Sequence, residues 1–220
     1  MFKRTVFNKS IIEKEESFFA QVTEILVIVL VALMIAVIFR TQVSLVRGVD
    51  GVSMQPTYNS AAAYSGRGIY DTVRITRLGS IKRGDVVTFE SKIPDGKGGF
   101  KILIKRVIGV GGDRLEFRKT PDGKGFLEVW RNGEKLSEPY IKADAGGTPL
   151  FTSSGSYAPD EEFTVPKGFY FVMGDNRNNS EDSRSGAVGM IAAKKVEGKV
   201  YLDVPKGDNY VSALWRKAFG

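Results

Sequence analysis

KILIKRVIGV, residues 101–110, is the stretch that decides the fold of this chain. It is rich in Ile, Leu and Val, which predicts a strand. Because side chains of a strand alternate between its faces, Lys101, Leu103, Lys105 and Val107 share one face. Lys105 therefore lies between apolar neighbours on its own face. Burial disfavours a charged ammonium and lowers the pKa of a lysine, which makes the amine a usable base. The structural alternative is a lysine on an edge strand that extends its charge into water.

Shorter β-rich runs fill most of the chain on either side of this strand. Gly, Pro, Asn and Asp separate them, and no long stretch beyond residue 40 has the 3.6-residue period of a helix. The runs are 71–77, 85–91, 114–119, 126–130, 169–173 and 199–204. The pair Asn132-Gly133 follows one of them and predicts a tight hairpin turn. The sequence therefore predicts a mainly β domain.

Two polar stretches interrupt the predicted strands. Residues 142–163 are rich in Gly and Ser, which predicts a long loop within an inserted subdomain of about 117–166. A second loop is predicted over residues 59–68.

The first forty residues have a different pattern. Residues 25–39, ILVIVLVALMIAVIF, contain no charge, and counting back to Phe18 gives twenty-two residues. At 1.5 Å per residue they span about 33 Å, enough for the hydrocarbon core of a bilayer. A cleaved signal peptide would end in small residues, but Phe39, Arg40 and Thr41 follow here. We therefore expect a transmembrane anchor at 18–40, rather than a cleaved signal or a buried helix of a soluble protein.

Basic residues flank this anchor unequally. Four of them precede it and two follow it closely: Lys3, Arg4, Lys9 and Lys14, then Arg40 and Arg47. The positive-inside rule therefore predicts a cytoplasmic segment at 1–17 and an extracytoplasmic domain at 41–220.

Two absences from the composition restrict the chemistry. The 220 residues include no His and no Cys, which excludes imidazole and thiol catalysis, disulfides, and His or Cys metal sites. The net charge of +7 is dispersed, with no basic run interleaved with aromatic residues, so nucleic-acid binding is not expected. Hydrolytic chemistry must come from Ser, Thr, Lys, Asp, Glu, Tyr or backbone groups.

Two further segments have unusual chemistry. In GVSMQPT, residues 51–57, Ser53 lies between a flexible Gly and a rigid Pro, which suits an exposed nucleophile as well as an ordinary turn. GDNRNNSEDSR, residues 174–184, directly follows the apolar run FYFVM. Its carboxylates do not fit a calcium loop, because Arg177 stands where an oxygen ligand is needed. We interpret this segment as a hydrogen-bonded, salt-bridged loop that supports a site.

Together these segments resemble the type I signal peptidase family of membrane-anchored Ser/Lys endopeptidases. The family motifs are S-M-x-P-T, R-G-D-V-V, K-R-x-x-G-x-x-G-D and G-D-N-R-x-x-S-x-D-S-R. They are matched, in the family's order, at 53–57, 83–87, 105–113 and 174–184. The resemblance implies a signal-peptidase-type β-fold with a small inserted β subdomain, preceded by one transmembrane helix. The shorter members typical of Gram-positive bacteria are the most similar.

The resemblance also implies roles for individual residues. Ser53 would be the nucleophile and neutral Lys105 the general base, with an acyl-enzyme intermediate. Ser180 would hydrogen-bond Lys105 and orient it, and Asp182 and Arg184 would form a salt bridge. Gly174 and Asp175 would lie beside the site, and the expected pocket walls are Val49, Met54, Leu103 and Ile104. No metal and no cofactor is needed.

The implied function is the removal of signal peptides from secreted preproteins after a small-x-small motif, such as A-x-A. Signal peptides and the lipid bilayer are the implied partners, and the cell membrane is the implied location, with the catalytic domain on its outer face. A self-cleaving repressor of the Ser/Lys type shares this fold, but it would need a DNA-binding helix-turn-helix instead of an anchor. A catalytically silent, membrane-tethered β-domain that binds other proteins would leave the motifs unexplained.

The chain departs from the family pattern at two glycines. Gly111 stands where the family often has Pro, which is expected to loosen that turn without affecting the Ser/Lys pair. Gly51 stands where some members carry a Ser whose hydroxyl helps to form the oxyanion hole. Backbone N–H groups, including that of Ser53, are expected to take this role.

Overall fold

The computed structural model describes residues 2–39, 45–60, 71–141, 151–204 and 210–219, and of 2–17 and 210 only the backbone. The chain divides into two compact units, Met1–Val43 and Ser44–Gly220. Parts of the two predicted loops, 61–68 and 142–150, lie outside the described residues.

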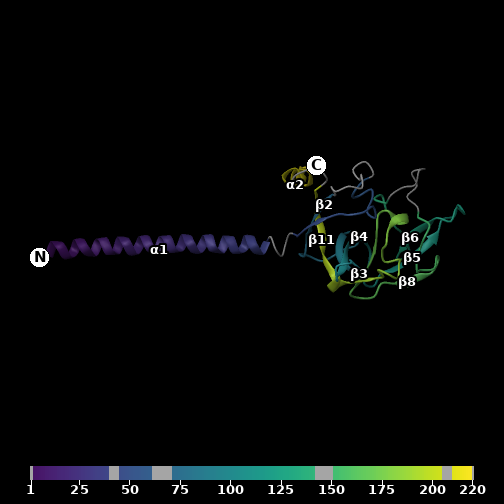
Figure 1. The fold of residues 1–220 in the computed structure, drawn as a ribbon, viewed down its shortest axis with the longest axis horizontal. Helices are drawn as coiled ribbons and strands as arrows, with labels where there is room; N and C mark the ends of the chain where they lie inside the picture. The colour runs from purple at the N-terminus through teal and green to yellow at the C-terminus, as the bar shows by residue number, and fades with distance from the viewer. Residues whose placement is uncertain (1, 40–44, 61–70, 142–150, 205–209, 220) are drawn as a thin grey trace. The chain divides into compact units, whose positions relative to one another are not determined.

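Helix α1, Phe2–Ile38, makes up the first unit (Figure 1). Its portion Phe18–Ile38 has a mean hydropathy of 2.7 and is long and apolar enough to cross a membrane. The helix begins sixteen residues before the predicted anchor. Hydropathy locates only the apolar part of a helix. The helix can extend beyond that part because no Gly or Pro interrupts the chain before Gly48.

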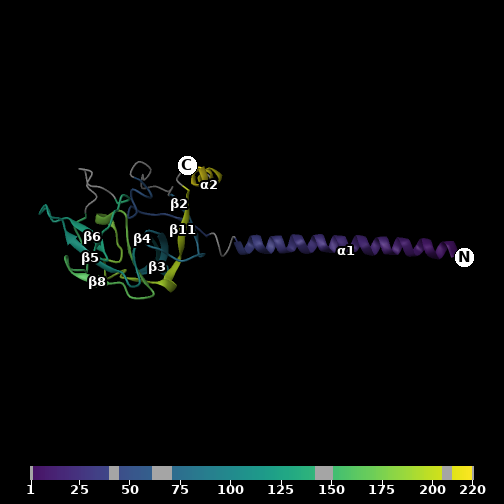
Figure 2. The ribbon, with the colours of Figure 1, turned by 180° about the vertical axis from the view of Figure 1, so that it is seen from behind.

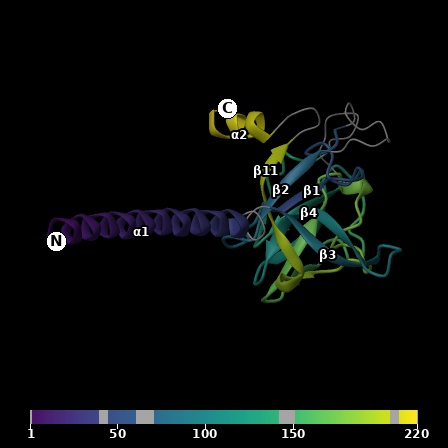
Figure 3. The ribbon, with the colours of Figure 1, turned by 60° about the vertical axis from the view of Figure 1, so that its left-hand side comes forward.

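Seven strands of the second unit form an antiparallel sheet with the order β1-β2-β11-β3-β4-β9-β10. Figure 3 shows β1, β2, β11, β3 and β4 of this sheet. The strands are β1 Leu45–Gly48, β2 Thr72–Thr76, β3 Val86–Pro94, β4 Phe100–Val110, β9 Phe169–Met173, β10 Ile191–Ala192 and β11 Val196–Val204. The stretch 101–110 is therefore a strand, β4, that lies between β3 and β9 in the sheet.

Four further strands form a smaller antiparallel sheet with the order β7-β6-β5-β8. They are β5 Arg114–Lys119, β6 Leu127–Arg131, β7 Glu134–Lys135 and β8 Glu162–Thr164. Figures 1 and 2 show β5, β6 and β8 at one end of the domain, away from β2 and β11. The predicted hairpin joins β6 to β7, and Asn132 and Gly133 both have positive φ, 55° and 86°.

The predicted fold class is confirmed, because the chain is mainly β with an N-terminal apolar helix. Each predicted run coincides with a strand to within a few residues. The sequence pattern does not predict the short strands β1, β8 and β10 or the helix α2, Tyr210–Phe219. Two 3-10 turns, η2 Arg177–Asn179 and η3 Ala193–Lys195, complete the described elements.

Three hydrophobic clusters hold the domain together. The largest contains side chains of both sheets, including Phe117 of β5 and Phe171 of β9, whose ring centroids are 6.1 Å apart. A second cluster joins Met54 and Tyr58, which follow Ser53, to Val73 and Ile75 of β2. The loop that carries Ser53 is therefore fixed to the sheet by buried side chains.

Gly111 lies where its own turn packs closely against the backbone of residues 166–168. A Cβ added there would lie 2.8 Å from the Cα of Lys167 and 3.0 Å from the carbonyl oxygen of Pro166. A side chain has no room at this position, and Gly lets the turn pack against residues 166–168. The expectation that Gly loosens this turn stays a prediction.

Candidate active site

Ser53 and Lys105 come together from distant parts of the sequence. Ser53 lies in a turn shortly after β1, whereas Lys105 lies in β4, opposite Val87 of β3. The Lys105 Nζ lies 2.7 Å from the Ser53 Oγ, and it also donates a hydrogen bond to the carbonyl oxygen of Ile104 at 2.9 Å. One group is held by a central strand and the other by a packed loop.

The surroundings of Lys105 change its acid-base behaviour. The side chain is 2% exposed, and this burial lowers its pKa to about 8, against the opposite effect of Asp182, Asp175 and Glu181. At pH 7 about one such amine in ten is neutral, compared with about one in 2,500 for an ordinary lysine. The amine can therefore accept a proton near neutral pH.

Two asparagines hold the backbone of the Ser53 loop. Asn176 donates from its backbone N–H to the Ser53 carbonyl and from its Nδ2 to the Val52 carbonyl, both at 3.0 Å. Asn59 donates from its Nδ2 to the carbonyls of Val49 at 2.6 Å and Gly51 at 3.0 Å. Sequence reasoning missed both residues, although the place of Asn176 inside a recognised motif was a signal.

The loop 174–184 is held by the expected ion pair between Asp182 and Arg184. The Arg184 Nε donates to Asp182 Oδ1 at 2.8 Å, and Asp182 Oδ2 accepts from the N–H of Gly174 at 3.0 Å. Burial acts to raise the pKa of Asp182, but Arg184 outweighs it and keeps this pKa below its ordinary value. Asp182 thus remains a buried carboxylate that fixes Gly174 beside the Ser53 backbone.

Ser180 is a partly buried residue of the same loop with a buried Oγ, but the expected hydrogen bond to Lys105 is absent. Its Oγ has no hydrogen-bond partner, and the Lys105 Nζ donates to Ser53 and Ile104. Ser180 and Ser53 can both pack against residue 174 because it is a glycine. An added Cβ there would collide with the Ser180 Oγ and the Ser53 carbonyl oxygen.

Arginine-carboxylate pairs connect the other motif segments. Arg106 binds Asp175 through two hydrogen bonds of 2.9 and 2.6 Å, and the hydroxyl of Thr57 donates to the same carboxylate at 2.5 Å. Arg83 pairs with Asp113 in the same bidentate way. Because each pair joins two motifs, the four motif segments form one connected structure around Ser53 and Lys105. Sequence reasoning identified Asp175 but missed its partner.

A cavity of about 140 Å³ lies beside Ser53 and Lys105. Of the predicted wall residues, Val49, Leu103 and Ile104 line it, whereas Met54 does not and is instead packed in the second hydrophobic cluster. Lining residues that the sequence analysis did not single out are Arg47, Gly48, Asp50, Val73, Thr88 and Ile102. The cavity thus lies between the β1 end of the sheet and strand β4.

The site combines a buried lysine amine, a serine hydroxyl within hydrogen-bond reach and a small adjoining cavity. These features define a class of hydrolytic site. They can support hydrolysis in which serine attacks and lysine acts as the base. The family assignment agrees with this class: the family model "Signal peptidase, peptidase S26" matches residues 22–204, and the chain belongs to this family.

Individual relatives give the same result. A signal peptidase I of Bacillus licheniformis is 37% identical over 191 residues, which cover 84% of this chain and 87% of that protein. Signal peptidase I T of Bacillus subtilis is 32% identical, over 77% of this chain and 78% of that protein. A solved signal peptidase I from Enterococcus faecalis aligns at 29% identity, over 56% of this chain and 99% of that one, with a TM-score of 0.40.

Proposed function

We propose that this chain is a membrane-bound serine endopeptidase that removes N-terminal signal peptides from secreted preproteins. The observation that supports the proposal most directly is the 2.7 Å distance between the Lys105 Nζ and the Ser53 Oγ. Family membership supplies the substrate class, because the curated relatives are named signal peptidase I.

In this proposal Ser53 is the nucleophile and Lys105 the general base. The neutral Lys105 amine takes the hydroxyl proton as the Ser53 Oγ attacks the scissile carbonyl. The resulting ammonium then gives that proton to the leaving amine, and the C–N bond breaks to leave an acyl-enzyme. A water molecule, deprotonated by the same amine, attacks the ester and releases the acid product and free Ser53.

The oxyanion that forms during this attack needs hydrogen-bond donors. Gly51 contributes no hydroxyl and has φ +83°, a conformation that disfavours Ser at this position. We therefore assign the role to backbone N–H groups, including that of Ser53. Ser180, Gly174, Asp175, Asp182 and Arg184 then act as supporting residues that hold the loop, with Ser180 proposed to orient the Lys105 amine during turnover.

The cavity beside the dyad favours small substrate side chains. A substrate bound as an extended strand directs its residues one and three before the scissile bond to the same side. A cavity of about 140 Å³ lined by Val49, Leu103 and Ile104 would have to take both of these side chains, which favours small ones such as Ala at both positions. Cleavage is therefore proposed after a small-x-small motif, with Met54 acting only from behind the loop.

The proposed topology follows from the flanking charges. Segment 1–17 is cytoplasmic, 18–40 is the single-pass anchor and 41–220 is the extracytoplasmic domain, with the region 117–166 as its inserted subdomain. The lipid bilayer is thus a second partner besides the signal peptide.

One experiment tests the dyad together with the substrate class. Detergent-solubilised chain is mixed with a preprotein, and cleavage is followed by gel for wild type, Ser53→Ala and Lys105→Arg. Wild type is expected to cleave and both variants to be inactive, since guanidinium is not deprotonated at these pH values. A preprotein with Phe directly before the bond is expected to remain intact.

The alternatives give different results. A silent binding protein would bind the preprotein and leave it whole in all three samples. Cleavage by Lys105→Arg at the wild-type rate would remove Lys105 from the mechanism. Cleavage directly after Phe would contradict the proposed pocket.

A further inference from the structure

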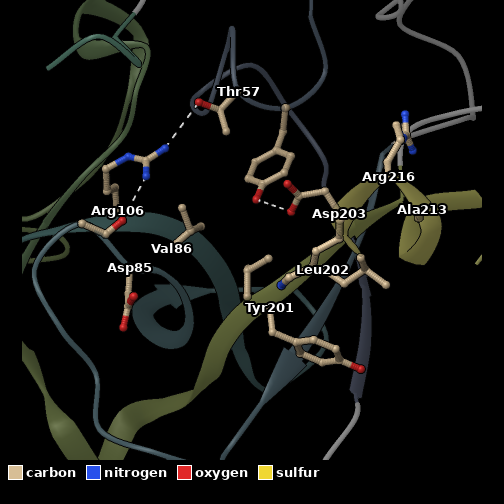
Figure 4. A pocket seen from close by; sticks show the side chains of 13 residues that line it. Thr57, Asp85, Val86, Arg106, Tyr201, Leu202, Asp203, Ala213 and Arg216 are labelled. Atoms are coloured by element: carbon tan, nitrogen blue, oxygen red, sulfur yellow. Dashed lines mark hydrogen bonds between the residues drawn. The ribbon is translucent and has the colours of Figure 1, made fainter. Parts of the chain in front are cut away.

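Helix α2, Tyr210–Phe219, follows the last strand and packs against it with its small and polar side. Ala213 is 2% exposed, and the Nζ of Lys217 lies 5.7 Å from the ring centroid of Tyr201 in β11. Figure 4 shows Ala213 and Arg216 beside Leu202 and Asp203 of that strand.

The opposite side of α2 is apolar and exposed. Val211, Leu214, Trp215 and Phe219 follow the i, i+3, i+4, i+8 spacing of one helix face. Their exposed fractions are 73%, 40%, 65% and 73% respectively. The rings of Trp215 and Phe219 lie 4.4 Å apart between centroids, so they form one aromatic surface. A helix of a globular domain normally turns such a face toward the core, whereas α2 turns it outward.

The space between α2 and the domain is unsuited to this apolar face. A cavity of about 690 Å³ lies there, and its lining includes the charged residues Asp85, Arg106, Asp203, Arg216 and Lys217 (Figure 4). Rotating the helix to bury Trp215 would place its ring against these charges. The apolar face of α2 therefore needs a partner from outside the domain.

We propose that this partner is the lipid bilayer in which the chain is anchored, and that α2 lies in the membrane interface as a second contact. Six residues separate Ile38, where α1 ends, from Leu45, where β1 begins. Fully extended they reach about 20 Å, so the domain cannot leave the vicinity of the bilayer.

The chemistry of α2 matches a membrane interface. Tryptophan and phenylalanine beside aliphatic residues partition into the boundary between headgroups and acyl chains. Arg216 and Lys217 flank the apolar face and carry the positive charge that anionic lipids attract. The inference concerns where the domain sits and does not depend on the proposed peptidase activity.

Tryptophan fluorescence tests the contact in the full chain. The chain has two tryptophans, so Trp130→Phe leaves Trp215 as the only one. This variant is reconstituted into vesicles of phosphatidylcholine with phosphatidylglycerol, some of them containing doxyl-labelled lipid. We expect quenching by doxyl groups near the headgroups and protection from aqueous iodide. Full access to iodide without quenching by lipid would overturn the proposal.

Matched variants separate the α2 face from general closeness to the membrane. Val211→Gln with Phe219→Gln, in the Trp130→Phe background, is expected to lose most of the lipid quenching. Leu78→Gln with Phe169→Gln changes two other exposed apolar residues and is expected to retain it. Equal loss in both pairs would overturn the assignment to α2. A third outcome is that Trp215 is protected from iodide but not quenched by lipid. If diluting the protein then removes this protection, the apolar face of α2 binds a second copy of the chain instead.

Discussion

Lys105 sets the pH range in which the proposed site can work. Burial lowers its pKa to about 8, and only the neutral amine can accept the proton of Ser53. Activity is therefore expected to rise with pH, with the midpoint of the rising limb near 8 and no separate step near 6.5, where an imidazole would titrate. The measurement is kcat/KM for a short peptide substrate between pH 6 and 10. A profile that is flat across this range would contradict the role of Lys105.

Gly174 is expected to tolerate no side chain. A Cβ there would collide with the Ser180 Oγ and with the carbonyl oxygen of Ser53, so the loop could not keep its place beside the nucleophile. Gly174→Ala should reduce kcat/KM at least about 100-fold, since a misplacement of about 1 Å is enough for such a loss.

Gly186→Ala is the matched control for this substitution. An added Cβ at Gly186 meets nothing within 4 Å, and the residue belongs to the turn that follows the same loop. Its activity should stay within about two-fold of wild type, as surface substitutions without lost contacts cost little. Equal activity of the two variants would show that the close packing at Gly174 does not position Ser53.

At the scale of residues, the sequence predicts the residues proposed to react better than the residues that hold them in place. Ser53, Lys105, Asp182 and Arg184 are recognisable because they lie in four motifs that together resemble a known family. Asn59 acts by holding backbone carbonyls, and backbone partners leave no pattern in the side-chain sequence. Asn176 lies inside the motif 174–184, but the motif does not reveal that it holds the backbone of the Ser53 loop. The structure does not contain the bond from Ser180 to Lys105 that the family resemblance implies. A motif match brings two residues near each other without fixing the rotamers that point them together.

At the scale of elements, apolar runs separated by turn residues made most of the strands predictable. β4, β5 and β9 were each marked by alternating or continuous apolar residues bounded by turn residues. β1 and β10 have only four and two residues, too few to show a period, and exist because a neighbouring strand pairs with them. α2 was missed although its apolar residues have helical spacing, because its ten residues cover less than three turns and give only a short pattern.

The buried ion pair between Arg177 and Glu138 gives a stability prediction for the loop 174–184. Their side chains are 1% and 7% exposed, and the Arg177 Nε also donates to the Gly174 carbonyl at 3.1 Å. Glu138→Gln leaves the Arg177 charge buried without its carboxylate. We expect this variant to lose about 3 kcal/mol of unfolding free energy, as for other buried pairs that lose one partner.

Glu162→Gln provides the comparison, because its pair with Arg114 is solvent-exposed and 3.5 Å long. It should cost no more than about 1 kcal/mol. Denaturant unfolding of both full-length variants in the same detergent measures the difference. Indistinguishable midpoints would mean that Arg177 finds another partner once Glu138 is neutral.

At the scale of the whole molecule, the flanking charges predict the orientation of the chain in the membrane. Four basic residues precede the apolar span and two follow it closely, so 41–220 should face outward. Protease added to intact spheroplasts is expected to digest the domain and leave a short N-terminal fragment, and a tag at the N-terminus should survive. If the domain were degraded only after the membrane was broken, both the topology and its role with secreted proteins would have to be abandoned.

The six residues between Ile38 and Leu45 also determine how this domain meets its proposed substrates. A domain on so short a tether and a preprotein held by its own apolar segment both diffuse in one plane. Their encounter rate then depends on molecules per unit area of membrane rather than on molecules per volume. Adding empty lipid to a fused vesicle preparation would therefore slow processing in proportion to the added area, although the bulk concentrations of both proteins stay the same.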